Sequence, residues 1–296
     1  MSGICEGRVA IVTGAGRGIG REHALAFAAA GAAVVVNDLE GDQGPAGEVA
    51  AEIRAAGGRA VAHGANVADW DQTGDLVATA IREFGDLHVV VNNAGNLRDR
   101  MFVSMSVEDW DAVMAVHLRG HFCTARHAVT YWRNKAKEGR APEGRIINTS
   151  SAAGLQGSVA QCNYGAAKAG IAAMTLIQAA ELGRYGITSN AIAPVARTRM
   201  TEELFKDMMS TDEGATFDEW DPANISPLVV WLGSAESGDV SGRVFEVCGD
   251  WIAPADGWRT GPKASNGGRR WDPAQVGPAL REVLGTMEPP QKVYGT

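Results

Sequence analysis

Short apolar runs alternate with longer mixed stretches along the first 250 residues. The apolar runs are four or five residues long, as strands buried on both faces of a sheet are. The first two lie at 9–12 and 33–36, and further strands are predicted at 60–63, 88–91, 145–149, 189–193 and 244–247. The mixed stretches predict helices at 19–30, 48–56, 70–84, 110–135 and 164–184. This alternation predicts an α/β protein with a Rossmann fold, in which a doubly wound parallel sheet carries helices on both faces.

The domain organisation follows from the same alternation of predicted strands and helices. No linker or repeat interrupts it, so residues 1–252 are interpreted as a single dinucleotide-binding and catalytic domain. Residues 253–296 hold six of the eleven prolines, together with Trp258 and Trp271. This composition predicts an ordered but irregular C-terminal arm.

Composition and charge exclude several classes of protein. The chain is 45% hydrophobic and 21% charged, which leaves ample material for a buried core. The net charge of −8 argues against nucleic-acid binding and against binding to anionic membranes. No apolar run approaches the ~18 residues of a membrane span, and the N-terminus does not resemble a signal sequence. The four cysteines show no metal-binding spacing. We therefore expect a cytoplasmic protein with reduced thiols and no metal site.

A glycine-rich turn joins the first predicted strand to the first predicted helix, in the segment 13–20. Glycines allow the backbone to turn sharply and approach a pyrophosphate, to which the helix N-terminus presents free N–H groups. The strand–turn–helix context makes this a dinucleotide site. The candidate cofactor-binding residues on the turn are Thr13, Gly14, Arg17, Gly18, Ile19 and Gly20.

An acid ends the second predicted strand. Asp38 stands where a carboxylate accepts hydrogen bonds from the adenosine ribose. A 2′-phosphate at this place would face a like charge, at a cost of up to about 4 kcal/mol for each charge pair at 4 Å. The sequence therefore predicts NAD rather than NADP as the cofactor. Arg17 could offset the repulsion, but on the turn it is expected to contact solvent or phosphate.

Two asparagine-containing segments follow the third and fourth predicted strands. Asn66-Val67 and Asn93-Ala94-Gly95 fall at the carboxyl ends of these strands, where open parallel sheets bind their ligands. Their side chains are expected either to hold the adenine or to brace the neighbouring backbone.

Three residues carry candidate chemistry. Ser151 follows the strand 145–149, Tyr164 comes thirteen residues later, and Lys168 four residues after that. Positions i and i+4 share one face of a helix, so the ammonium is expected beside the phenol. An unperturbed tyrosine has a pKa near 10, which a neighbouring cation and the charge of an oxidised nicotinamide would lower. Tyr164 is then a candidate general base, with Ser151 polarising the substrate oxygen.

At these residues the sequence resembles the short-chain dehydrogenase/reductase family. The match runs from the glycine turn through Asn93 and the catalytic residues to the segment 190–194 and on to about Trp251. The resemblance implies cofactor roles for Thr13, Gly14, Gly18, Gly20, Asp38, Asn66, Asn93, Tyr164, Lys168 and Thr198. It also implies a homodimer or homotetramer.

The chain departs from the family pattern at two positions. His117 replaces the usual catalytic asparagine, which in the family holds a water that links the lysine to solvent. Histidine can also donate and accept hydrogen bonds, so it either continues a proton relay or serves packing. Pro194-Val195 replaces the usual Pro-Gly, which predicts altered backbone beside the nicotinamide, with Pro194 still a candidate contact.

Several segments are similar to the dehydrogenase domains of peroxisomal multifunctional enzymes of type 2. They are 36–39, 97–100, 116–120, 227–232 and 245–247. The resemblance implies oxidation of a (3R)-hydroxyacyl-CoA with NAD, whereas related proteins act on steroids. The partner is thus a small molecule, either an acyl thioester or a steroid. Arg98, Arg100 and Arg119 are candidates for attracting a CoA phosphate or a carboxylate, or else form a solvated basic surface.

Other readings of the sequence remain open. One is reduction of 3-oxoacyl thioesters, and another is a cofactor-binding regulator without turnover. The presence of Ser151, Tyr164 and Lys168 together disfavours the regulator. The segment 200–220 lies where the family places a substrate lid, and its composition fits an interface helix equally well.

Overall fold

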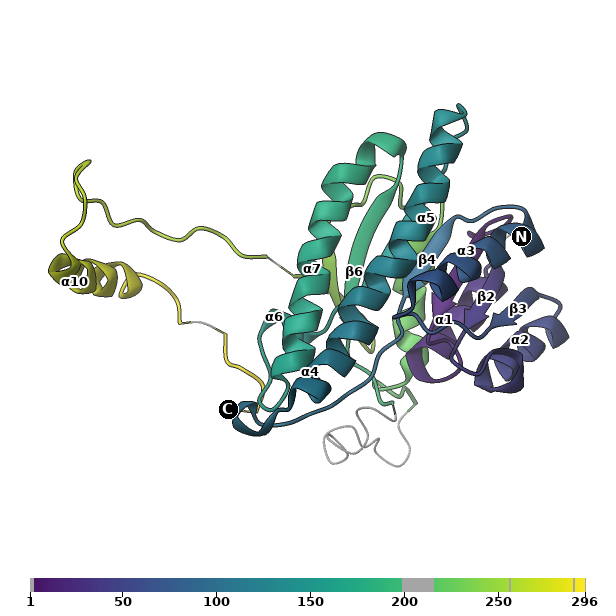
Figure 1. Ribbon diagram of the computed structural model, residues 1–296, viewed down its shortest axis with the longest axis horizontal. Coiled ribbons are helices and arrows are strands. Elements are labelled where there is room, and N and C mark those ends of the chain that lie inside the picture. Colours follow the sequence, from purple (N-terminus) through teal and green to yellow (C-terminus); the bar gives the residue numbers. More distant parts are fainter. Residues whose placement is uncertain (1–2, 199–215, 256, 290, 296) are drawn as a thin grey trace.

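The computed structural model describes residues 3–198, 216–255, 257–289 and 291–295. Within these ranges the strands form one eight-stranded sheet of order β3-β2-β1-β4-β5-β6-β7-β8 (Figure 1). The strands are β1 (Val9–Thr13), β2 (Ala33–Asn37), β3 (Arg59–His63), β4 (Val89–Asn92), β5 (Arg145–Thr149), β6 (Thr188–Pro194), β7 (Val244–Cys248) and β8 (Trp251–Pro254). Neighbouring strands are parallel except for β8, which is antiparallel to β7. The doubly wound α/β fold is thereby confirmed.

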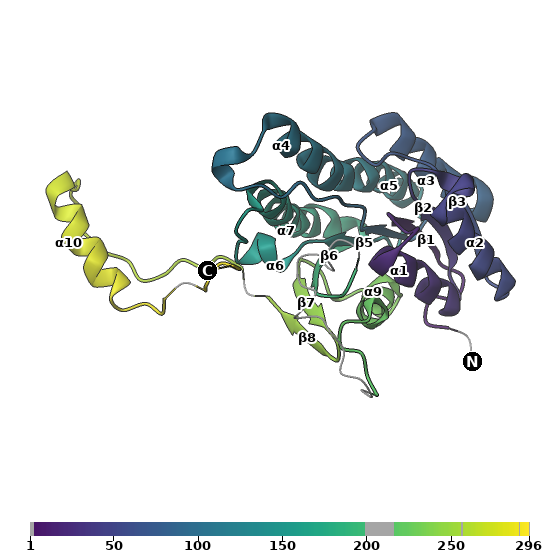
Figure 2. The ribbon, with the colours of Figure 1, turned by 90° about the horizontal axis from the view of Figure 1, so that it is seen from below.

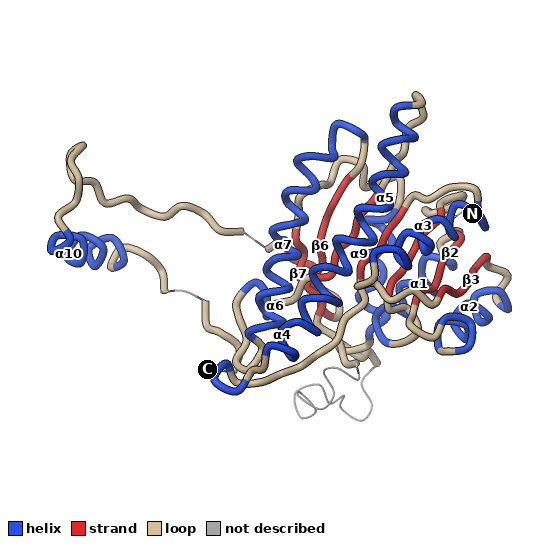
Figure 3. The backbone as a smooth tube through the Cα atoms, in the orientation of Figure 1, coloured by secondary structure: helices blue, strands red, loops and turns tan. Residues whose placement is uncertain are grey.

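Helices cover both faces of the sheet (Figures 2 and 3). They are α1 (Gly18–Ala29), α2 (Pro45–Ala55), α3 (Trp70–Phe84), α4 (Val107–Met114), α5 (Gly120–Lys137), α6 (Ala152–Leu155), α7 (Cys162–Leu182), α9 (Ser226–Gly233) and α10 (Pro273–Leu284). Short turns are η1 (Gly41–Gln43), η2 (Phe102–Ser104), η3 (Ala115–Arg119), η4 (Gly183–Tyr185) and η5 (Pro222–Ile225). Figure 2 shows α1, α2 and α9 on one face and α3, α4, α5 and α7 on the other. No described helix combines the length and apolarity needed to cross a membrane.

Each strand contributes to two hydrophobic cores, one on each face. In β1, Ala10 and Val12 join the core that contains residues of α1, α2 and α9. Val9 and Ile11 join the core that contains residues of α3 and α5. Successive side chains of a strand point to opposite faces, so a strand covered by helices on both sides is apolar throughout. This is why β1, β2 and β4 begin with continuous apolar runs rather than alternating patterns, whereas β5 and β6 also carry buried polar residues such as Asn148 and Asn190.

The helix expected at 110–135 begins at Val107 and is not regular. Between α4 and α5 the chain makes one π-helical turn, η3, which contains His117. Such a turn holds an extra residue and is frequent at functional sites. Apolar periodicity could not reveal it, because the helix axis continues on both sides.

The C-terminal region differs from its expected form in two ways. Strand β8 extends to Pro254, two residues past the boundary placed at 252. The expectation of an irregular arm is wrong for 273–284, which form α10. The Asp272 side chain accepts a hydrogen bond from the Ala274 N–H and caps the helix, and Pro273 occupies its first turn, where a missing N–H costs nothing. The high proline content of the arm favoured the prediction of irregular structure, although Asp272 and Pro273 are typical of a helix start. Of the expected lid segment, residues 200–215 lie outside the described residues.

Candidate active site

The backbone of the turn between β1 and α1 requires glycine at several positions. Gly14 and Gly18 have φ values of +61° and +55°, in the left-handed region that side chains disfavour. At Gly20 a Cβ would lie 2.3 Å from the Gly14 carbonyl oxygen and 2.4 Å from the Asn93 amide nitrogen. Both the conformation and the close packing therefore require glycine here. The turn leaves the α1 N-terminus, with Arg17 exposed at the N-cap, facing the carboxyl edge of the sheet.

Asp38 closes this turn from the end of β2. Its carboxylate accepts a hydrogen bond from the Gly16 N–H at 3.1 Å and one from the Leu39 N–H at 2.8 Å. A Cβ at Gly16 would lie 2.7 Å from that carboxylate. The half-buried acid is therefore fixed beside the turn as the sequence predicted. The turn, the helix N-terminus and the carboxylate together fit a dinucleotide.

Thr13 and Asn93 brace the ends of β1 and β4. The Thr13 hydroxyl accepts from the Asn93 and Ala94 N–H groups at 2.9 and 3.1 Å. The Asn93 amide donates to the carbonyls of Thr13 and Gly14 at 2.9 and 3.2 Å. Of the two roles expected for this asparagine, the structure shows backbone bracing.

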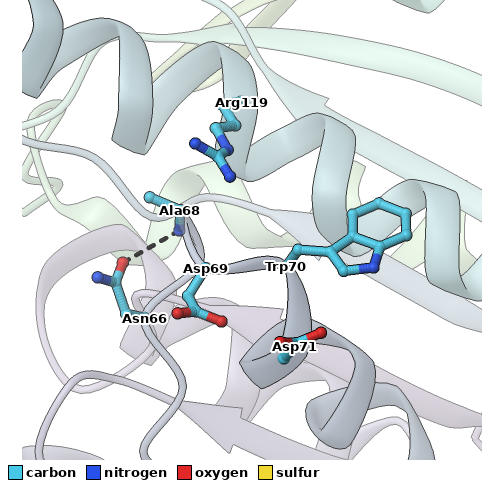
Figure 4. Close-up of a pocket in the computed structure, with 6 residues that line it drawn as sticks. All are labelled: Asn66, Ala68, Asp69, Trp70, Asp71 and Arg119. Carbon is cyan, nitrogen blue, oxygen red and sulfur yellow. Dashed lines mark hydrogen bonds between the residues drawn. The ribbon is translucent and has the colours of Figure 1, made fainter.

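Asn66 lines an open pocket of about 370 Å³ beyond β3 (Figure 4). Its side chain accepts a hydrogen bond from the Ala68 N–H at 3.0 Å, and Val67 is buried next to it. The other lining residues are Ala68, Asp69, Trp70, Asp71 and Arg119. Arg119, on η3, lines this pocket, whereas Arg98 and Arg100 do not. The three arginines are therefore not gathered around this pocket.

Ser151, Tyr164 and Lys168 meet at the carboxyl end of β5. Ser151 caps the short helix α6, and its hydroxyl accepts from the Ala153 N–H at 3.2 Å. Tyr164 and Lys168 lie on α7, with the Lys168 ammonium 5.4 Å from the centre of the Tyr164 ring. Nζ of Lys168 donates to the Thr149 carbonyl at 2.6 Å. The structure thus brings the three predicted catalytic residues together.

Burial controls the protonation of this cluster. It lowers the pKa of Lys168 to about 7 and raises the pKa of Tyr164, against a hydrogen bond with Ser151 that lowers it. Burial disfavours whichever form is charged, which explains the opposite directions. The protein groups alone therefore do not bring the pKa of Tyr164 toward neutrality.

His117 lies against this cluster. Its ring meets the Tyr164 ring edge-on, with 5.2 Å between centroids. Nε2 lies 2.7 Å from the Asn96 carbonyl oxygen, and the Asn96 N–H lies 3.1 Å from it. Both contacts are made at Nε2, so the backbone of Asn96 holds the ring at this nitrogen. Nδ1 is buried and has no hydrogen-bond partner in the described part of the chain, and burial lowers the pKa of His117 to about 3. A Cβ at Gly95 would lie 2.5 Å from this ring, so Gly95 makes room for it.

Three residues of the site were not predicted from the sequence. Asn96 fixes the His117 ring through its backbone, and Thr149 holds Lys168 through its carbonyl. His121, one helical turn after His117, is buried and lies 3.4 Å from the Thr149 N–H. Backbone partners leave no side-chain signal, but the i, i+4 spacing of the two histidines was visible.

The remaining predicted contacts lie near the same edge. The Val195 N–H donates to the Val247 carbonyl at 2.9 Å, so the backbone after Pro194 stays attached to β7. A Cβ at Gly18 would lie 3.6 Å from the Thr198 methyl group, which places Thr198 beside the glycine turn. Within the described ranges, no cluster of three or more His, Cys, Asp or Glu could hold a metal ion.

Comparison with known proteins identifies the family. Residues 8–209 match the short chain dehydrogenase family, which is more than half of the chain. The chain belongs to this family. A crystal structure of a short chain dehydrogenase from Mycobacterium avium covers 99% of the chain and 100% of that protein, with a TM-score of 0.91 and 59% identity. This protein is accordingly an oxidoreductase acting on CH–OH groups with a nicotinamide cofactor.

Curated relatives of this short-chain dehydrogenase include a hydroxyacyl-CoA dehydrogenase and a multifunctional enzyme. Hydroxyacyl-CoA dehydrogenase ChsB1 of Mycobacterium tuberculosis is 44% identical over 98% of this chain and 93% of the relative. Peroxisomal multifunctional enzyme type 2 of Mus musculus is also 44% identical, over 83% of this chain but only 32% of the relative. The chain thus corresponds to nearly the whole of the first relative and to about a third of the second.

Proposed function

We propose that this short-chain dehydrogenase oxidises a (3R)-hydroxyacyl-CoA with NAD. The observation that carries the choice of cofactor is the carboxylate of Asp38, fixed against the Gly16 N–H at the end of β2. A ribose hydroxyl can donate to this carboxylate, whereas a 2′-phosphate would be repelled. The acyl thioester is supported by the hydroxyacyl-CoA dehydrogenase that matches nearly end to end.

Ser151 and Tyr164 have different roles at the substrate hydroxyl. The bound nicotinamide supplies the hydride acceptor. Ser151 Oγ holds the substrate oxygen by a hydrogen bond, and Tyr164 Oη takes the hydroxyl proton. Because its surroundings raise the pKa of Tyr164, the phenolate needs further positive charge close by. Lys168 beneath the ring, together with the oxidised cofactor, would provide that charge when protonated.

His117 completes a path for the proton in this scheme. The buried Nδ1 of His117 has no hydrogen-bond partner among the described residues, and the Lys168 ammonium has N–H groups beyond the one bonded to Thr149. A water between them would satisfy both groups. Since its pKa is held near 3, His117 stays neutral and positions this water rather than carrying charge. His117 is thus a positioning residue.

The test is the initial rate of NADH formation with 3-hydroxyacyl-CoA esters of several chain lengths. The (3S) enantiomers are the matched controls, and hydroxysteroids form a second panel. We expect turnover of the (3R) esters to exceed that of both controls by at least tenfold in kcat/KM. Turnover of steroids alone would retain the cofactor and catalytic residues but overturn the substrate.

The reverse reaction gives a second candidate. A 3-oxoacyl-[acyl-carrier-protein] reductase of Synechocystis is 46% identical over 67% of this chain and 77% of the relative. If the chain works as such a reductase, it should consume 3-oxoacyl thioesters with NADPH faster than it oxidises hydroxyacyl esters with NAD. The two cofactors, tested in both directions, separate these functions.

A further inference from the structure

The C-terminal arm, described at residues 255, 257–289 and 291–295, is attached to the body at both of its ends. At its start the Ala255 N–H donates to the Val244 carbonyl at 2.9 Å. At its end the Val159 N–H donates to the Tyr294 carbonyl at 2.9 Å, and the Tyr294 N–H to the Gly157 carbonyl at 3.2 Å. Between these points α10 stands away from the body in two perpendicular views (Figures 1 and 2). The arm is therefore an open loop that reaches outward.

Helix α10 carries an apolar stripe. Val276, Leu280 and Leu284 recur at helical spacing, yet no residue of α10 is buried, and Leu280 and Leu284 are 50% and 62% exposed. A helix of twelve residues is marginal in water by itself, and Pro278 removes one of its internal hydrogen bonds. A stable α10 therefore needs a surface to pack on.

The body also exposes apolar side chains. Phe102, Val103 and Val107, on η2 and at the start of α4, are 77%, 90% and 69% exposed. These three residues, close together in the chain, are called the η2–α4 patch. Two apolar surfaces on one chain, one on an outward arm and one on the body, allow reciprocal contacts that close as a two-fold dimer.

Charge favours the same pairing. The arm segment 257–271 contains four cationic residues and no acidic one, within a chain of net charge −8. The η2–α4 patch is followed at once by acids, of which Glu108 and Asp111 are exposed. The basic part of the arm and the acidic start of α4 therefore attract each other between copies.

We propose that α10 docks on the η2–α4 patch of a second copy of this chain, and that α10 of the second copy docks on the η2–α4 patch of the first. The arm then also links this interface to the catalytic centre, because its end is bonded to Gly157 and Val159, five to seven residues before Tyr164. A contact at α10 therefore stabilises the segment that leads into α7. This last step rests on the proposed function, whereas the docking itself does not.

The test is the mass of the full chain in solution, by analytical ultracentrifugation over a range of concentrations. Leu280→Gln/Leu284→Gln keeps helix propensity but removes the apolar stripe, and we expect it to raise the dissociation constant between copies at least tenfold. Ala274→Gln/Glu282→Gln changes the other side of α10 and is the matched control, with no effect expected. Phe102→Gln/Val103→Gln should reproduce the effect of the stripe variant from the opposite side.

Equal dissociation constants for the stripe variant and the control would overturn the proposal, as would a monomeric wild-type chain. Binding of NAD, followed by fluorescence titration, should stay unchanged in the stripe variant and shows that the body is intact. With substrate, we expect the stripe variant to raise KM more than it lowers kcat. An altered mass with an unchanged KM would overturn the link to the catalytic centre alone.

Discussion

The glycine turn and the catalytic cluster lie at the same edge of the sheet but are built on different physical principles. At the turn, positive φ values and lack of space for a Cβ select glycine at Gly14 and Gly20. At the cluster, burial of Tyr164, Lys168 and His117 shifts their protonation. The first region is specified by backbone geometry and by the close approach of the backbone and of Asn93. The second depends on what surrounds each side chain.

This difference predicts how the two regions respond to substitution. Changes at the cofactor side should alter which cofactor binds, and changes at the cluster should alter rates and their pH dependence. The following variants test that division, from the largest expected effect to the smallest.

Tyr164→Phe removes the proton acceptor and leaves the ring in place. We expect kcat to fall by roughly 10²–10⁴-fold, the range typical of a lost general base. Binding of NAD, measured by fluorescence titration, should be nearly unchanged. Tyr185→Phe, in η4, is the control and should keep full activity. Near-normal turnover of the Tyr164 variant would remove Tyr164 from the chemistry.

Asp38→Ala removes the carboxylate beside the glycine turn. We expect the ratio of kcat/KM for NADP to that for NAD to rise by about 10–100-fold, a discounted value for one close charge repulsion. Asp42→Ala, an exposed acid on η1, is the matched control. If both variants keep the original preference, the discriminating contact lies elsewhere.

His23 tests the effect of burial away from the catalytic cluster. Burial lowers its pKa to about 3, so the unfolded chain binds a proton near pH 6.5 that the folded chain does not. Stability is therefore lost as pH falls below 6.5, by about 2 kcal/mol between pH 7 and pH 5 for this one residue. His23→Gln should reduce the difference in urea unfolding free energy between these two pH values by that amount.

Ser226→Ala is the control for His23, since it removes the hydroxyl 2.9 Å from Nδ1 but keeps the buried ring. It should keep the full pH dependence, even if it lowers stability at both pH values. An unchanged pH dependence in His23→Gln would show that the ring is hydrated or already protonated in the folded chain.

His117 should have the smallest effect, because it acts through Lys168. We expect His117→Ala to lower kcat about tenfold or less and to shift the pH profile of kcat, with little change in KM for NAD. His117→Asn, which restores an amide that can hold a water, should recover most of the rate. Equal rates for the alanine variant and wild type would assign the ring to packing alone.

The sequence alone determined the features that depend on local geometry. The positions of β1 to β7 were predicted from the sequence, because strands buried on both faces are largely apolar, whereas β8 was not predicted. Helix α3 was predicted with its true bounds. The glycine turn, Asp38 and the spacing of Ser151, Tyr164 and Lys168 were likewise evident in the chain. Each of these depends on residues close together in sequence, where periodicity and backbone preference act.

Only the tertiary structure decided the features that depend on surroundings. The π turn at His117, the Asn96 and Thr149 carbonyls that hold His117 and Lys168, and the upward shift of the pKa of Tyr164 all come from burial between distant elements. The same holds for α10, whose start signals were visible in Asp272 and Pro273 but whose apolar stripe is not buried by the part of the chain that the structure describes. Desolvation and packing are properties of the assembled fold, so no local pattern records them.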